Sequence, residues 1–471
     1  MFLAAAAVLM LEILAARVMA PYVGVSLNTY TGIIGTVLGG IATGTWLGGR
    51  AADVISPNKL LGPILIVGGL LTVTSAPLVT ALGEHLHADS LIAIVALSAA
   101  TIFLPALVLS GVTPIVAKMQ LHDLKVTGRI VGRLSACATA GALVGTFGTG
   151  FVLAAHLHTR VILTAVGIIL VGAGAILWWR LTRLRPLAVL LIVAATLAAS
   201  GTAAGVGGPC RIESGYFCIR VFSAPPDDSG RVLMLDDVRH SYVDLRNPRN
   251  LVFDYAKAIA AAMQAQAQPG KPISVLHIGG GAFTLPRYIA ATRPGSTNTV
   301  MEIDPAVVDV ARADFGLHTG PKLRADIGDA RVLMKRERPH SYDFVVGDAF
   351  AGRSPPWQLT TRQFLIQVRT LLRPRGAYLM NLIDNGQRFV RAEAATMEEV
   401  FPHVAVFDLP GETHNHVLIG SNVPIDVAAI AARAARASFL TMPVAGARLQ
   451  HFIGDATVLD DDFAPVDQLV G

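Results

Sequence analysis

Three glycines and a glutamate in the second half of the chain have the types and the spacing that could hold a nucleotide-like ligand. Gly279, Gly280 and Gly281 directly follow the apolar run Ser274–Ile278. Backbone without side chains can approach a ligand here and offer N–H donors at a helix start. Glu302 lies 23 residues after Gly279, where a carboxylate can accept hydrogen bonds from both hydroxyls of a ribose.

Two aspartates follow in the order that such a site needs. Asp329 lies in a Gly-Asp-Ala tripeptide, where its carboxylate could accept a hydrogen bond from an exocyclic amine. Asp348 ends the apolar run Tyr342–Gly347. Ile303 and Ala330, which directly follow Glu302 and Asp329, are expected to be further contacts of the ligand.

The triple glycine alone is weak evidence, and a single carboxylate at a strand end is commonly just solvated. The prediction of a nucleotide-type ligand therefore depends on the whole ordered set. Thr284 stands where a Gly-x-Gly-x-x-Gly motif would have its third glycine. This difference argues against a standard NAD site.

Elements of two kinds must position these residues. Buried strands alternate with amphipathic helices from about residue 251 to 425, and this alternation predicts a Rossmann-like, doubly wound parallel sheet. In such a sheet ligands bind at the carboxyl ends of the strands. The predicted strands are Ser274–Ile278, Thr299–Asp304, Tyr342–Gly347 and Ala377–Ile383, and the predicted helices follow Gly281, start at Pro305 and cover Arg362–Leu372. Residues 426–471 are expected to form a helical tail.

A small β-strand domain is expected just before this sheet, over residues 209–250. Three short alternating runs, Tyr216–Ser223, Arg231–Leu235 and His240–Leu245, predict strands, with a turn at Pro225–Asp228. A helix is predicted over Val252–Gln264.

The first 208 residues have the composition of a membrane domain. The whole chain is 53% hydrophobic and only 15% charged, which is outside the range of ordinary soluble domains. Crossing a bilayer takes about 20 apolar residues. Seven runs qualify and predict an all-α bundle of seven helices: Leu3–Met19, Thr31–Gly49, Leu60–Leu82, Ser90–Ala117, Leu134–Ala155, Val161–Trp179 and Leu187–Val206.

Glycines at four-residue spacing in the second and fifth runs predict close helix packing in lipid. The rows are Gly35 and Gly39, then Gly40, Gly44 and Gly48, and in the fifth run Gly141 and Gly145. Glu12 is a carboxylate at membrane depth, where charge is costly and faces the bundle interior. Pairing with Arg17 and a functional role are both compatible with its position.

Loop charges predict the orientation of a multi-pass protein of the plasma (inner) membrane. Nine basic residues follow the second, fourth and sixth runs, against two on the other side, which makes those loops cytoplasmic. Seven spans then place the chain after Val206 outside. Cys210 and Cys218 would suit an oxidising exterior as a disulfide, but they could also be two free thiols. An adenosyl donor is cytosolic, so the side of the carboxy-terminal domain stays open, with the charges favouring the outside.

Charge and cysteine usage argue against two other classes of function. Up to Gly208 the chain has 11 Lys and Arg against 5 Asp and Glu, whereas the remainder has 27 against 28. The basic balance therefore comes from membrane loops and predicts no nucleic-acid partner. No cysteine spacing matches a zinc site, so no metal is expected.

The chain resembles the spermidine synthase family of aminopropyltransferases, and in particular its membrane-fused branch, the fused transporter/spermidine synthase proteins. The resemblance covers nearly the whole chain. It rests on Leu11–Leu14 with Arg17, Leu47–Asp53, Gly132–Phe151, Leu233–Asp237, Val275–Gly281, Met301–Asp304, Tyr342–Asp348 and Asp461–Asp467.

This resemblance implies roles for the candidate residues. The donor would be S-adenosylmethionine or its decarboxylated form, used as a co-substrate, with Glu302 on the ribose and Asp329 on the adenine amine. Asp348 matches the aspartate that deprotonates the attacking amine in the family. His240 and Tyr255 are weaker candidates for contact with a small-molecule amine or another substrate. The lipid bilayer and a second copy of the chain are the other expected partners.

The departures from the family lie on the acceptor side. Ala282 replaces an acid that grips the amino end of the transferred group, and His240 replaces a glutamine. After Asp348 the segment Ala349–Arg353 supplies no acid and adds a cation, although a polycation site should be acidic.

Three functions remain open at this point. Aminopropyl transfer to an amine, with release of methylthioadenosine, follows from the resemblance and is the function that we expect. Methyl transfer from S-adenosylmethionine, or its cleavage without a polyamine, is the alternative. A non-catalytic domain that senses an adenosyl ligand is the third.

Overall fold

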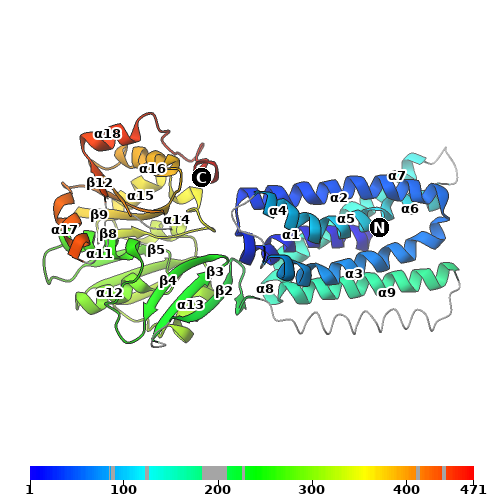
Figure 1. Cartoon of the computed structure of the whole chain (residues 1–471), viewed down its shortest axis with the longest axis horizontal. Helices are drawn as coiled ribbons and strands as arrows, with labels where there is room; N and C mark the ends of the chain where they lie inside the picture. Colours follow the sequence, from blue (N-terminus) through cyan, green and yellow to red (C-terminus); the bar gives the residue numbers. More distant parts are fainter. Residues whose placement is uncertain are drawn as a thin grey trace. The chain divides into compact units, whose positions relative to one another are not determined.

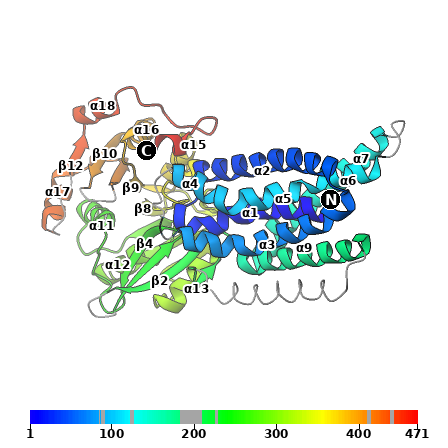
Figure 2. The same ribbon diagram turned by 45° about the vertical axis from the view of Figure 1, so that its right-hand side comes forward.

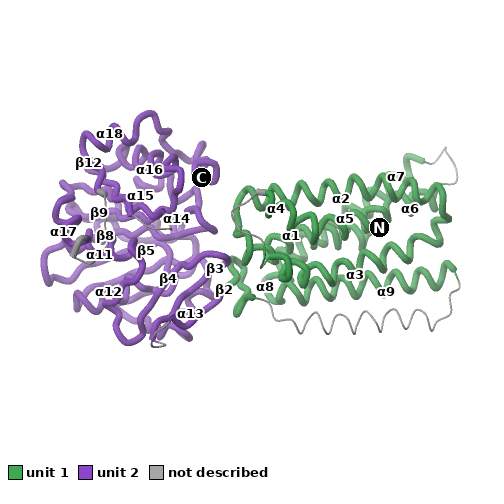
Figure 3. The backbone as a smooth tube through the Cα atoms, viewed as in Figure 1, with its two compact units in different colours: residues 1–218 green, residues 219–471 purple. Residues whose placement is uncertain are grey.

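The structure is a computed structural model that describes residues 1–83, 85, 91–121, 127–182, 209–224, 229–409, 414–436 and 442–470. The chain divides into two compact units, Met1–Cys218 and Ile219–Gly471, coloured separately in Figure 3. The first unit is helical and the second is an α/β unit. The predicted seventh span, Leu187–Val206, and the predicted turn at Pro225–Asp228 lie outside the described residues.

Long helices that run lengthwise form the first unit (Figures 1 and 2). Two breaks are π-helical, at Ala99–Phe103 between α4 and α5 and at Gly148–Leu153 between α7 and α8. The helices are α1 (Phe2–Val23), α2 (Leu27–Val54), α3 (Pro57–Gly83), α4 (Leu91–Ser98), α5 (Leu104–Ser110), α6 (Val112–Gln120), α7 (Thr127–Phe147), α8 (Ala154–His156) and α9 (Thr159–Thr182).

Five helical stretches among the described residues are long and apolar enough to cross a membrane: Phe2–Val23, Pro57–Gly83, Ile92–Gln120, Thr127–Leu153 and Thr159–Thr182. The predicted count of seven is not confirmed, because the last predicted span lies outside the described residues and α2 is not among these five. The second predicted span does form a helix, α2, and its 28 residues would extend about 42 Å. α2 is not among the five because glycine and threonine dilute its apolar residues.

Two of the three predicted glycine rows lie where helices approach closely, whereas a Cβ on Gly35 or Gly39 would meet no backbone within 4 Å. A Cβ placed on Gly44 or Gly48 would collide with the backbone of Leu107 or Gly111. On the other side of the unit, Gly141 and Gly145 of α7 lie against the backbone of α1. This packing is the one predicted for small residues in lipid.

The predicted alternative of an Arg17–Glu12 pair is wrong. Arg17 instead forms an ion pair with Glu213, with 3.5 Å between Nε and Oε1. Its guanidinium also donates to the Ala154 carbonyl at 2.9 Å. Arg17 therefore connects helix α1 to a segment almost 200 residues away, which sequence spacing could not reveal.

A four-stranded sheet follows the helices in the chain. Its strands, in the order β1-β2-β3-β4, are Ile212–Glu213, Cys218–Ala224, Gly230–Leu235 and Val238–Asp244. The three predicted strands match β2, β3 and β4 within two residues, and β1 was not predicted. This sheet does not form a compact unit of its own, because the division between the two units falls inside β2.

The α/β unit contains an eight-stranded sheet in the order β12-β10-β11-β9-β8-β5-β6-β7. Neighbours from β7 to β9 pair in parallel, as the alternation of strands and helices predicted. These strands are β5 (Ser274–Ile278), β6 (Thr297–Glu302), β7 (Leu323–Ile327), β8 (Tyr342–Gly347) and β9 (Leu372–Ile383). The chain goes from β5 outward to β7 and then returns to β8, so the strand order reverses between β5 and β8.

Alternate side chains of this sheet enter two apolar cores. Leu276, Val345 and Met380 lie in the core with helix α15 (Arg362–Leu371) and helix α16 (Arg388–Glu398). Their neighbours Val275 and Val346 lie in the core with α11 (Asp254–Gln266), α12 (Thr284–Thr292) and α17 (Val427–Arg436). Because both faces of the sheet are buried, its strands appear in the sequence as continuous apolar runs.

The far side of the sheet is antiparallel and was not predicted. β11 (Asn415–Ser421) pairs with β9, β10 (His403–Asp408) pairs with β11, and β12 (Met442–Ala445) pairs with β10. The predicted helical tail, residues 426–471, therefore supplies a strand to the sheet. It also forms α17, α18 (Ala447–Ile453) and the short α19 (Val466–Leu469).

Candidate active site

The candidate residues follow four neighbouring strands at their carboxyl ends. In spatial order these strands are β8, β5, β6 and β7, and they are followed by Asp348, the glycines, Glu302 and Asp329. Three strand spacings amount to about 14 Å, which suits an elongated ligand lying across the sheet edge. The break in strand order between β5 and β8 is the crevice where open α/β sheets bind ligands.

The glycine loop has no room for side chains at two positions. Gly279 has a φ of +93°, and a Cβ there would collide with the backbone carbonyl of Asp348. Gly281 has a φ of +48°, and a Cβ there would collide with the Ser241 hydroxyl. Both glycines are thus required by conformation and by close approach. The loop leads into helix α12, whose first residue is Thr284.

Glu302 is buried at the end of β6 and held by backbone donors. Its Oε2 accepts from Gly280 N at 2.8 Å, and its Oε1 accepts from Asp304 N at 3.0 Å. Burial raises the pKa of the Glu302 carboxyl, and the N–H donors oppose that rise. A carboxylate has about four acceptor sites, so two remain for ribose hydroxyls. The site therefore fits the ligand predicted for it.

Asp329 lies after β7 and caps the short helix α14 (Ala330–Leu333). Its Oδ1 accepts from Val332 N at 3.2 Å, which leaves Oδ2 for an exocyclic amine. Ala330 is 7% exposed, whereas Ile303 beyond the β6 end is 37% exposed. Ile303 can thus supply an apolar surface for a base.

Asp348 lies just after β8 within a network of neutral polar groups. Its Oδ1 accepts from Asn381 Nδ2 at 2.9 Å, and the Tyr255 hydroxyl is a second partner. Burial raises the pKa of Asp348 to about 6, although both partners lower it. A carboxyl with this pKa is ionised at neutral pH and is a stronger base than an exposed aspartate.

Tyr255 lies beside this carboxylate, and His240 is linked to it through Tyr255. The Tyr255 hydroxyl donates to the His240 carbonyl at 3.2 Å, and it has a single proton to share with Asp348. Burial lowers the pKa of His240 to about 4, so its ring is neutral at physiological pH. The ring meets Phe350 edge-on, with 6.1 Å between the ring centroids. Of the two weaker candidates, the structure therefore brings Tyr255 into contact with Asp348.

The residues that depart from the family pattern also have definite places. Arg353 forms an ion pair with Asp237, with 3.1 Å between Nη2 and Oδ2, and the Asp237 side chain is 8% exposed. The acidic side chain that the turn between β3 and β4 supplies is thereby neutralised. Ala282 is fully buried, and its N–H donates to the Ser241 hydroxyl at 3.1 Å.

Three residues of this site were missed by sequence reasoning. Asn381 of β9 donates to Asp348 and accepts from Asn415 Nδ2 of β11 at 2.9 Å, and both asparagines are buried. Ser241 of β4 holds the glycine loop. A lone asparagine within the apolar strand Ala377–Ile383 was the available signal, because a buried amide must find partners.

The described ranges contain no group of three or more His, Cys, Asp and Glu side chains placed to bind a metal ion.

No family model matches the chain. Among curated proteins, a polyamine aminopropyltransferase of Vibrio vulnificus is 32% identical over 180 residues, which cover 38% of this chain and 58% of the relative. An eEF1A lysine and N-terminal methyltransferase of Danio rerio is 30% identical over 166 residues, covering 33% of this chain and 24% of that protein. The chain thus spans less than two-thirds of the length of either relative.

One solved structure is similar over a larger share of its own length. A probable spermidine synthase of Corynebacterium glutamicum is 27% identical, with a TM-score of 0.49, and the match covers 53% of this chain and 95% of that one. The sequence relatives are transferases, as expected. The curated aminopropyltransferase relatives thus support, over part of the chain, the resemblance to the spermidine synthase family.

Proposed function

We propose that this protein is a membrane-bound transferase that moves an aminopropyl group from decarboxylated S-adenosylmethionine to an amine and releases methylthioadenosine. The observation that carries the proposal is the position of Asp348. It lies at the reversal of strand order, next to the side-chain-free Gly279, with a pKa raised to about 6.

The chemistry follows from this geometry. The amine nitrogen forms a bond to the donor's propyl carbon, and the bond from that carbon to the sulfonium sulfur breaks, leaving its electron pair on sulfur. The amine loses a proton, which the Asp348 carboxylate accepts. Glu302 and the glycine loop hold the adenosine part, so the reacting carbon lies toward the β8 side of the site.

The acceptor is proposed to be an amine without a second cationic group. Arg353 neutralises Asp237, His240 is neutral, and Ala282 supplies no carboxylate. A second ammonium group would therefore enter this half of the site without a compensating charge, which is costly.

Methyl transfer from S-adenosylmethionine is a second candidate. It is favoured by the methyltransferase relative, which is as similar in identity as the aminopropyltransferase relative. The adenosine contacts proposed for Glu302 and Asp329 would serve either donor. The two reactions differ in the carbon that is attacked and in the product that leaves.

A product assay separates these functions. Purified full-length protein would be incubated with S-adenosylmethionine or its decarboxylated form, each with putrescine, with propylamine or with no amine. Methylthioadenosine formed only from the decarboxylated donor with an amine supports aminopropyl transfer. S-adenosylhomocysteine would indicate methyl transfer, methylthioadenosine without amine would indicate cleavage, and binding without any product would indicate a sensor.

The assay has a matched pair of variants. Asp348→Asn removes the proposed base, whereas Asp309→Asn makes the same change at a 71% exposed side chain of helix α13 (Pro305–Asp314). Activity should be lost only in the first variant. Equal loss in both variants would remove Asp348 from the mechanism.

We propose further that the helices span the inner membrane and that the α/β unit is outside. Two observations support this side: the bias of basic residues in the loops, and the Cys210–Cys218 disulfide, because disulfides persist in oxidising compartments. Reporters fused after Gly471 test it. An alkaline phosphatase fusion should be active and a green fluorescent protein fusion dark, and the reverse pattern would place the unit in the cytosol.

A further inference from the structure

A cavity of about 620 Å³ lies at one end of the helical unit. Its volume is within the range of small-molecule binding pockets, about 300–1,000 Å³. The carboxyl-terminal ends of α1 and α3, the first turns of α9 and the segment before β1 form its walls. The lining residues are Arg17, Val18, Pro21, Tyr22, Thr80, His158, Thr159, Arg160, Val161, Thr164, Ala165, Ile168, Pro209, Cys210, Arg211 and Glu213.

One wall of this cavity is an apolar face of α9. Val161, Thr164, Ala165 and Ile168 recur at the three- and four-residue spacing that places side chains on one side of a helix. Val161 is 51% exposed although it is apolar. An acyl chain lying along this face would cover it.

The cavity lining also contains charged residues. These are three arginines, Arg17, Arg160 and Arg211, and a single acidic residue, Glu213. Guanidinium groups bind phosphate through paired, charge-assisted hydrogen bonds. The lining therefore has the charge of an anion site joined to an apolar wall.

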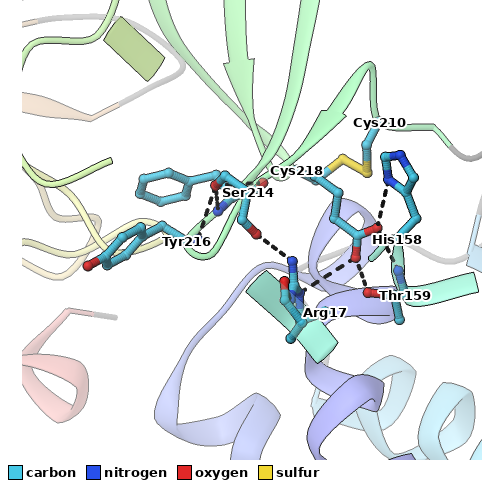
Figure 4. A network of polar contacts seen from close by, with 10 residues as sticks. Arg17, His158, Thr159, Cys210, Ser214, Tyr216 and Cys218 are labelled. Carbon is cyan, nitrogen blue, oxygen red and sulfur yellow. Dashed lines mark hydrogen bonds and ion pairs between the residues drawn. A yellow bond between two sulfur atoms is a disulfide. The ribbon is translucent and has the colours of Figure 1, made fainter. Parts of the chain in front are cut away.

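Arg17 is held by contacts within the helical unit (Figure 4). Arg17 pairs with Glu213 and donates to the carbonyls of Ala154 and Ser214. Glu213 accepts from Thr159 N at 3.0 Å. Arg160 Nη2 donates to Thr80 Oγ1 at 2.6 Å, which connects α9 to α3.

A covalent bond also secures the segment that supplies two of these charges. The disulfide joins Cys210 to Cys218, eight residues apart, and the closed loop contains Arg211 and Glu213. The disulfide restricts the conformation of this loop, and the contacts of Glu213 with Arg17 and Thr159 join the loop to α1 and α9.

We infer that this cavity binds a membrane lipid with an anionic phosphate headgroup. The phosphate would lie among Arg17, Arg160 and Arg211, and an acyl chain would follow the apolar face of α9. The cavity lies at the helix ends, which is the depth at which headgroups meet a bilayer-spanning bundle. The inference depends on the membrane location of the helical unit and is independent of the reaction proposed for the α/β unit.

Lipid binding by the full chain in neutral detergent tests this site. The probes are dioleoylphosphatidylglycerol, dioleoylphosphatidylcholine with the same chains, and inorganic phosphate, measured by native mass spectrometry and by thermal unfolding. Both lipids carry a phosphate, but the choline ammonium of phosphatidylcholine would lie near the same arginines, where a like charge is repelled. We therefore expect phosphatidylglycerol to bind tighter than phosphatidylcholine by about tenfold and to raise the unfolding temperature. Inorganic phosphate should neither bind as tightly nor raise the unfolding temperature.

Two variants and a control locate the binding. Arg160→Gln with Arg211→Gln should abolish the preference for the anionic lipid, and Thr164→Trp should reduce binding of both lipids by filling the cavity. Arg129→Gln with Arg133→Gln makes the same charge change on α7, outside the cavity lining, and should leave the preference intact.

Three outcomes would overturn the inference. Equal binding of the two lipids would remove the role of the headgroup charge, and phosphate as effective as lipid would make the cavity a plain anion site. Equal loss of the preference for the anionic lipid in the α7 control variant would show a general effect of protein charge. The methylthioadenosine assay, run on the same preparations, reports separately on the α/β unit, so failure of either proposal is recognised independently.

Discussion

The two halves of the candidate site are built in different ways. The donor half consists of the glycine loop, Glu302 and Asp329, which follow β5, β6 and β7 in chain order. Backbone N–H groups hold its carboxylates. The acceptor half, around Asp348, is formed by side chains from the turn between β3 and β4, from β4, α11 and β9, and from the loop after β8. Its charge and the pKa of Asp348 depend on burial and on contacts among elements that are distant in the chain.

This difference shows how one half can keep its ligand while the other changes. The donor half depends on strand order and on glycines that tolerate no Cβ, so few substitutions fit it. The acceptor half depends on individual side chains, and single replacements such as Arg353 alter its charge. A change of acceptor is therefore easier to reach than a change of donor.

The largest expected effect separates chemistry from binding. Asp348→Asn should lower kcat by about 10²–10⁴-fold, the range for loss of a general base, while the affinity for the donor stays unchanged. Stopped-time product assays and calorimetry measure the two quantities. A variant with normal kcat would show that the acceptor half holds no base.

The next effect concerns the donor half alone. Glu302→Gln should weaken donor binding by about 1–3 kcal/mol, the loss on damaging a charge-assisted hydrogen bond in a buried place. Calorimetry with S-adenosylmethionine and methylthioadenosine measures it. Glu399→Gln, at an exposed residue after α16, serves as the control. Unchanged affinity in Glu302→Gln would reject the ribose contact.

A third prediction concerns the pH dependence of the acceptor half. A base with a pKa of about 6 must be ionised to work, so kcat/KM should fall as the pH drops below 6 and level off above it. Asn381 and Tyr255 lower that pKa. Asn381→Leu or Tyr255→Phe should therefore move the acidic limb upward by about one pH unit, the equivalent of one hydrogen bond.

Its control is Tyr288→Phe on α12, which removes a hydroxyl that accepts from Gln264 of α11 and is not a partner of Asp348. This variant should keep the wild-type profile. If the acidic limb of the kcat/KM profile does not shift in Asn381→Leu and Tyr255→Phe, a group other than Asp348 is responsible for that limb.

The smallest effect tests acceptor charge. Arg353→Ala frees Asp237 from its ion pair and should favour an acceptor with a second ammonium group. The Arg353 side chain is 48% exposed, so solvent screening limits this gain in selectivity. We expect the ratio of kcat/KM for putrescine to that for propylamine to rise by about threefold to fivefold. Arg312→Ala, in an exposed pair with Asp309, should leave the ratio as it is. An unchanged ratio in both would show that Arg353 does not select the acceptor.

Sequence reasoning reached the parts of the molecule that depend on local order. Glycines after β5, an acid after β6 and an acid after β8 must meet at one sheet edge, because parallel strands align their carboxyl ends. The apolar runs likewise predicted the long helices, and the rows of small residues predicted where those helices approach. In each case a short segment contains all the information required.

Contacts between distant segments were decided by the tertiary structure alone. Arg17 finds Glu213 rather than Glu12, Asn381 reaches Asp348 while holding Asn415, and residues 442–445 return to the sheet as β12. Charge and hydrogen-bonding capacity are visible in a sequence, but the partner and the burial that set a pKa depend on the packing of whole elements. For this reason a ligand class could be proposed from the order of the residues, whereas the raised pKa of Asp348 could not.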